Sequence, residues 1–156
     1  MVKSRFPVYW LGFEFRGMRI TSVTIDPAEA VTIHYGDCVL GGQYTCVTPI
    51  SIVSSPDNSF IPGAGAGTRS LALRGVSASV AQGGDTLAIP TGGVVVSVYA
   101  RDPALARLGA TMMAPLNAEG LPQMPLPAAL PDTGLDRTPL PSEVPPGVSV
   151  PRPSGA

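Results

Sequence analysis

Cys38 and Cys46 are the two cysteines of this 156-residue chain, and they stand eight positions apart across Gly41 and Gly42. Thiols at the two ends of a turn can meet without moving the flanking strands, and closing so small a ring stabilises a fold by about 2.5 kcal/mol. We therefore predict a disulfide between Cys38 and Cys46. Such a bond persists in oxidising compartments, so it favours an extracytoplasmic location.

His34 is the single histidine, which excludes a multi-histidine metal site. With Asp37 and Cys38 nearby in sequence, it suggests a Cys-His-Asp nucleophilic site. Residues this close at one strand end tend to splay apart, and Cys46 offers the Cys38 thiol a disulfide instead. We favour a structural role for His34 and predict no catalytic residue, metal or cofactor. A cytosolic thiol or redox protein, or a hydrolase, centred on Cys38 and His34 is the alternative, although the cysteine spacing differs from that of disulfide-exchange motifs.

The segment 62–69 reads Pro-Gly-Ala-Gly-Ala-Gly-Thr-Arg, and exposed amides beside Arg69 could hold an anion. A phosphate-binding loop needs a buried strand before it and a helix with Lys-Ser/Thr after it. Here a strand-like Ser-Leu-Ala-Leu follows at 70–73. We interpret the segment as a connector and keep Arg69 as a residue of a ligand or partner surface.

Four aromatic residues stand close together at the N-terminus: Tyr9, Trp10, Phe13 and Phe15. Alternation places Tyr9, Phe13 and Phe15 on one face, which we expect to be core, with Trp10 on the opposite face. An exposed aromatic group of this kind can bind a ligand or a protein partner. The predicted ligand or partner surface therefore consists of Tyr9, Trp10 and Arg69.

These residues must be positioned by short strands, because apolar and polar residues alternate with a period of two at 18–25, 30–35, 49–54, 75–81 and 86–89. The valine-rich run 94–100 suits a central strand buried on both faces. A helix is expected over 103–114, with Asp102 as N-cap and an apolar face of Leu105, Leu108, Met112 and Leu116. We predict an α+β fold: an antiparallel-rich sheet of about six to seven short strands with one C-terminal amphipathic helix packed on it.

The compact domain is expected to span residues 5–117, because ten of the 18 prolines fall within 118–156. Proline removes backbone donors and fixes φ, so no core can form there. We predict a disordered Pro-rich tail over 118–156. It is a plain tail or a docking segment for a protein partner.

The charge is nearly balanced, with ten basic against eleven acidic residues, so no field draws the chain to nucleic acid. No apolar run is long enough to span a bilayer. Residues 1–7 lack the apolar stretch of a signal peptide, so an extracytoplasmic protein would need a start upstream of Met1. We expect an extracytoplasmic or cell-envelope location, with a cytoplasmic one as the alternative.

Several short motifs resemble small cell-envelope domains of high-G+C Gram-positive bacteria. They are Pro-Val-Tyr-Trp-Leu-Gly at 7–12, Tyr-Gly-Asp-Cys at 35–38, Cys-Val-Thr-Pro at 46–49, Thr91-Gly92 with the valine strand, and Asp-Pro-Ala-Leu at 102–105. The resemblance covers residues 7–117 and implies an extracytoplasmic setting, with no catalytic residue to carry over. We therefore expect a non-catalytic structural or interaction module with a Pro-rich tail. A small-ligand binding protein using the N-terminal aromatic segment is the second hypothesis.

Overall fold

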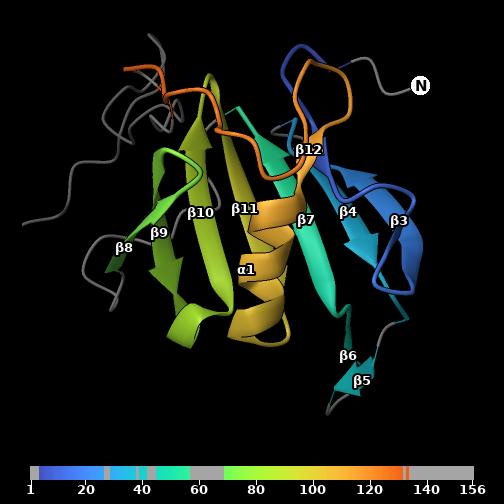
Figure 1. The fold of residues 1–156 in the computed structure, drawn as a ribbon. Helices are drawn as coiled ribbons and strands as arrows, with labels where there is room; N and C mark the ends of the chain where they lie inside the picture. Colours follow the sequence, from blue (N-terminus) through green and yellow to red (C-terminus); the bar gives the residue numbers. More distant parts are fainter. Residues whose placement is uncertain are drawn as a thin grey trace, which may run out of the picture.

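A single large sheet dominates the computed structural model, which describes residues 4–26, 29–37, 39–41, 45–56, 69–131 and 133. Its eight strands follow the order β2-β3-β4-β7-β11-β10-β9-β8, and every neighbouring pair is antiparallel (Figure 1). Their bounds are β2 (Glu14–Phe15), β3 (Met18–Ile25), β4 (Val31–Tyr35), β7 (Ile50–Ser55), β8 (Arg69–Leu73), β9 (Val76–Ala81), β10 (Thr86–Thr91) and β11 (Val94–Ala100). The α+β class and the antiparallel sheet are confirmed.

The predicted count of six to seven strands is too low. Besides the eight-stranded sheet, two small pairs form, β1 (Tyr9–Trp10) with β12 (Ala114–Pro115) and β5 (Val39–Gly41) with β6 (Thr45–Val47). These strands are only two or three residues long, so they carry too few residues for an alternating pattern to be recognised. Their pairing partners, not their own sequence, make them strands.

The centre of the sheet follows the sequence pattern closely. β11 lies between β7 and β10, and its residues from Val94 to Val98 are buried, as predicted for the valine-rich run. In β4, Ile33 and Tyr35 are buried, while His34 alternates to the other face of the sheet. The face with Ile33 and Tyr35 belongs to the core beneath the helix.

Helix α1 (Pro103–Met112) lies against β7, β10 and β11 (Figure 1). Its start is as predicted. The Asp102 carboxylate accepts a hydrogen bond of 2.8 Å from the Leu105 amide, and Pro103, which has no amide N–H, occupies the first helical position, where no N–H is needed. It ends at Met112, and the Met113 amide donates to the Gly109 carbonyl.

The helix face that meets the sheet is rotated from the predicted one and shares only Leu105 with it among the buried residues. Its buried residues are Leu105, Ala106, Gly109 and Ala110. A Cβ on Gly109 would lie 2.6 Å from Ile50 Cδ1, so a glycine here lets the helix approach the sheet closely without a shift of the Ile50 side chain. Leu108 and Met112 lie beside this contact and are partly buried against the core, while Leu116 is exposed.

The predicted domain boundary at 117 falls before a segment that packs on the sheet. The Leu126 amide donates to the Arg74 carbonyl at 2.8 Å, and Leu126 itself is buried. Gly92 exchanges backbone hydrogen bonds with Ala128 and Leu130, its amide donating at 3.1 Å and its carbonyl accepting at 2.9 Å. Residues 118–131 therefore belong to the fold, whereas the rest of the predicted tail, 134–156, lies outside the described residues.

Candidate functional site

A groove runs along one side of α1, between the helix and the N-terminal aromatic segment. Its volume is about 610 Å³. Two glycines, Gly12 and Gly120, and two charged residues, Glu14 and Arg16, complete a lining that is otherwise apolar: Trp10, Leu11, Phe15, Leu108, Met112, Ala114, Pro115, Leu121 and Pro122. We call this feature the α1 groove.

The N-terminal wall of the groove is held by buried hydrogen bonds. The Tyr35 hydroxyl accepts from the Leu11 amide at 2.8 Å and donates to the Gly12 carbonyl at 2.9 Å. Burial raises the pKa of Tyr35, so the hydroxyl keeps its proton at neutral pH and can make both bonds. One tyrosine of the core thus fixes the backbone that carries Trp10.

Trp10 lies in β1, which pairs with β12, and its ring packs edge-to-face on Phe13 at a centroid distance of 4.9 Å. Phe13 is 80 % exposed, so its predicted place in the core is wrong, whereas Phe15 is buried as expected. Alternation fails at Phe13 because Gly12, with φ +85°, turns the chain between β1 and β2. The turn brings Trp10 and Phe13 together at the surface.

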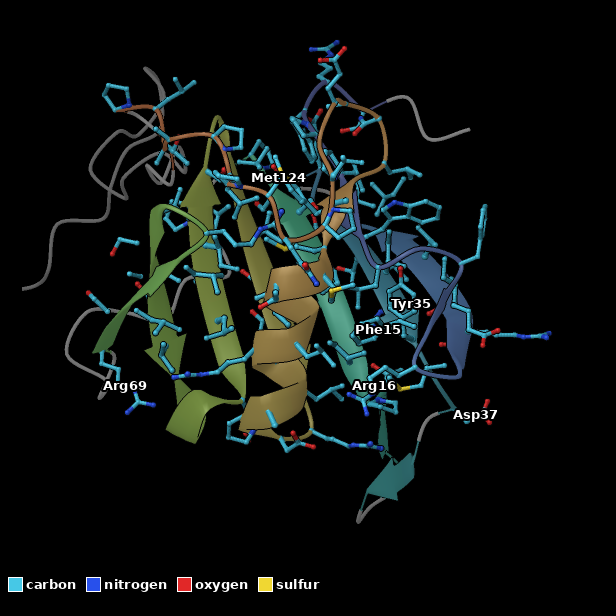
Figure 2. The ribbon with its side chains drawn as sticks, viewed as in Figure 1. Phe15, Arg16, Tyr35, Asp37, Arg69 and Met124 are labelled. Carbon is cyan, nitrogen blue, oxygen red and sulfur yellow. The ribbon has the colours of Figure 1, made fainter. Side chains whose placement is uncertain are left out.

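Arg16 stands at the rim of the groove, in the two-residue turn between β2 and β3. Positive φ angles at Arg16 (51°) and Gly17 (78°) identify a type I′ turn. The exposed Arg16 side chain forms no ion pair or hydrogen bond with the residues that the structure describes. Figure 2 shows Phe15 and Arg16 on the same side of α1.

A smaller hollow of about 230 Å³ adjoins the groove. It shares Arg16 and Leu108 with the groove and is further lined by Arg101, Asp102, Ala104 and Leu105. Arg101 is 3.6 Å from the Asp102 carboxylate, and both side chains are largely exposed. Two arginines therefore face a hollow that continues from the apolar groove.

The opposite wall of the groove, around Pro115 and Leu121, is fixed by Arg74. Its guanidinium donates to four carbonyls: Ala110 at 3.1 Å, Met113 at 2.7 Å, Leu121 at 3.0 Å and Met124 at 2.7 Å. Carbonyls in the last turn of a helix lack intrahelical partners, and a cation is favourable there. Partial burial lowers the pKa of Arg74, which nevertheless stays charged.

His34 belongs to a separate polar cluster on the face of the sheet opposite α1. Its Nδ1 lies 2.8 Å from Ser51 Oγ and 3.3 Å from Thr48 Oγ1, and those two hydroxyls are 2.8 Å apart. Burial lowers the pKa of His34, so the imidazole is neutral at pH 7. Asp37 is exposed, and Cys38 lies outside the described residues. The structure thus supplies hydroxyl partners for His34 that the sequence-based hypothesis did not include.

The three residues predicted to form a ligand or partner surface are not brought together. Tyr9 is 3 % exposed, and its hydroxyl bonds to the Thr91 side chain, which leaves it in the core. Trp10 lines the α1 groove. Arg69 is exposed at the start of β8, the edge strand farthest from β2, and lies across the helix from Arg16 in Figure 2.

The predicted disulfide stays a prediction, because Cys38 lies outside the described residues; in the β5–β6 pair the backbone of Cys46 is opposite Leu40. Glycine-rich residues 62–68 also lie outside the description. Within the part of the chain that the structure describes, no three His, Cys, Asp or Glu residues gather as a metal site. Nor does any helix there have the length and apolar character needed to cross a membrane.

Comparisons with protein-family models, curated proteins and solved structures give no match. Two residues were not predicted from the sequence: Arg16, which lines the groove, and Arg74, which donates to carbonyls at its opposite wall. A partial signal for them exists: Arg-Gly stands twice between apolar residues, in Phe-Arg-Gly-Met and in Leu-Arg-Gly-Val, with glycine at a position where a two-residue turn needs a positive φ.

Proposed function

We propose that this protein is a non-catalytic binding protein that holds a small, largely apolar ligand in the α1 groove. The observation that carries the proposal is the groove itself, whose volume of about 610 Å³ suits a small molecule. Its lining is predominantly apolar with few polar groups, as is usual for such sites. From the N-terminal aromatic segment, Trp10 lines the groove and would contact the ligand.

Apolar side chains that line the groove remain partly exposed, as is typical of a binding surface and not of a closed core. Leu108 and Met112 are only partly buried against the core, so each keeps apolar surface for a ligand to cover. Methionine adapts its shape easily, and tryptophan offers a large apolar area with one polar donor. Covering this surface would release about 25 cal/mol for each Å² removed from water.

Trp10 is the single tryptophan, so its fluorescence reports directly on the groove. Titration with dodecanol should give a saturable change in its emission. Leu108→Ser should weaken this binding about tenfold, because it removes apolar contact area from the groove wall. Leu130→Ser is the matched control, since Leu130 is exposed and does not line the groove. A non-saturable response of the wild type, or equal losses in both variants, would contradict the proposal.

An interaction module of the cell envelope, recruiting a protein partner through a Pro-rich tail, is the second proposal. We place it after ligand binding because residues 118–131 of the predicted tail are engaged with the sheet, which leaves 134–156 for such a partner. The extracytoplasmic setting rests on the spacing of Cys38 and Cys46. Mass measurement of the protein from its native cells, after thiol alkylation without reduction, tests that setting: two alkylated cysteines would argue for a reducing compartment.

A further inference from the structure

We infer that the α1 groove selects ligands with a single anionic head on an apolar body, such as a monomeric long-chain carboxylate, and that Arg16 binds the head. This inference rests on the proposed ligand-binding function and names the ligand class. It draws on three independent features: the shape of the paired hollows, the pairing state of the charges around them, and the backbone at Arg16.

The two hollows match the two parts of such a ligand. The larger is apolar and would take the chain, while the smaller contains Arg16 and Arg101 and would take the head. Arg16 and Leu108 line both hollows, so the two are adjacent and Arg16 stands where one passes into the other. A ligand that filled only the apolar groove would leave this cationic end unused.

The charges around Arg16 favour an anion over a cation. Both acidic residues at the hollows already have partners: Glu14 is 3.8 Å from Arg19, and Asp102 caps α1 and lies 3.6 Å from Arg101. Arg16 alone among these charged side chains has no partner in the described residues. A carboxylate would supply it with charge-assisted hydrogen bonds in the bidentate geometry that a guanidinium favours.

The backbone conformation at Arg16 is the third feature. With φ 51°, Arg16 occupies the first central position of a type I′ turn, which asparagine, aspartate and glycine fill with less strain. A residue held in this region is strained, and strain of this kind concentrates at ligand-binding positions. Arg74 has nearly the same φ and forms hydrogen bonds at the end of α1, whereas Arg16 forms none with the described residues.

Fluorescence titration of Trp10 tests the inference on the full chain, with dodecanoate and the neutral dodecanol compared below their aggregation concentrations. The wild type should bind dodecanoate about tenfold more tightly than dodecanol, the scale of one charge-assisted contact at a partly exposed site. Arg16→Gln should remove this preference, so that the two ligands bind with about equal affinity. Arg16→Lys should restore part of it, and Arg69→Gln, an exposed arginine on the far edge strand, should change nothing.

The outcomes separate the two proposals. If neither ligand changes Trp10 emission saturably, the groove is not a ligand site and the proposed function fails. If both bind equally and Arg16→Gln has no effect, the groove binds apolar ligands and the assignment of the head to Arg16 is overturned. Binding of anionic vesicles without any response to monomeric dodecanoate would also overturn it, in favour of a lipid surface. Circular dichroism of each variant checks that it is folded.

Discussion

Two Arg-Gly turns of this protein have similar backbone φ angles, but their arginine side chains differ in the contacts that they make. Arg16-Gly17 joins β2 to β3 with φ angles of 51° and 78°, and Arg74-Gly75 joins β8 to β9 with φ angles of 50° and 85°. The Arg74 guanidinium donates to four carbonyls at the end of α1 and beyond it. The Arg16 guanidinium has no partner in the described residues and stands at the α1 groove.

The surroundings of a turn, and not its local sequence, therefore decide which contacts its arginine makes. Both arginines occupy a left-handed position that costs conformational energy. At Arg74 the hydrogen bonds to α1 and to residues 121–124 offset that cost within the fold. At Arg16 no hydrogen bond or ion pair within the described residues does so.

Substitution of each arginine by asparagine tests this contrast between the turns, and the larger effect on stability is expected at Arg74. Arg74→Asn keeps a residue suited to the turn but leaves four carbonyls without their donor. We expect the free energy of unfolding to fall by about 2–3 kcal/mol, because unmet hydrogen bonds to a charged group carry this cost. Urea unfolding monitored by circular dichroism measures the change. A loss below about 0.5 kcal/mol, the scale of an ordinary surface substitution, would show that Arg74 does not hold the helix end.

Sequence could predict the regular parts of this arrangement. Tyr35 alternates with His34 in β4 as its pattern indicates, and the Asp102 cap begins α1 where it was expected. Patterns of this kind reflect the residue period of one strand or one helix, so they can be recognised within a single segment of sequence. That is why the sheet and the start of the helix were predictable.

The groove was not predictable, because its walls come from segments distant in sequence. Residues 10–16 meet residues 108–122 there, and a local pattern carries no information about that meeting. The face of α1 was misassigned for the same reason, since Gly109 fits against Ile50 only when the sheet is present. Arg74, whose partners lie 36 to 50 positions away, illustrates the point for a single side chain.

Arg16→Asn should have the opposite sign from Arg74→Asn. Asparagine adopts the left-handed conformation more readily than arginine, and no described hydrogen bond is lost, so we expect a gain in stability of about 0.5–1 kcal/mol. The measurement is the same urea unfolding, and dodecanoate titration on the same sample should show weaker binding. A variant that is less stable and binds dodecanoate as tightly as the wild type would show that Arg16 stabilises the fold, as Arg74 does, and does not bind the ligand.

A pH series tests whether either Arg-Gly turn is coupled to His34, which lies on the face of the sheet opposite α1. Burial lowers the pKa of His34 below its ordinary 6.5, so the unfolded chain binds a proton that the folded chain does not. The contribution of His34 to stability is therefore complete above about pH 6.5 and is lost as pH falls from there through the folded pKa.

Unfolding free energies measured between pH 7 and about pH 5 should decline equally in the wild type, Arg16→Asn and Arg74→Asn, since carboxylates titrate mainly below this window. His34→Gln should flatten the decline in all three backgrounds. A decline that differs between the two arginine variants would mean that one of the turns is coupled to the polar cluster of His34, Ser51 and Thr48, on the face of the sheet opposite α1.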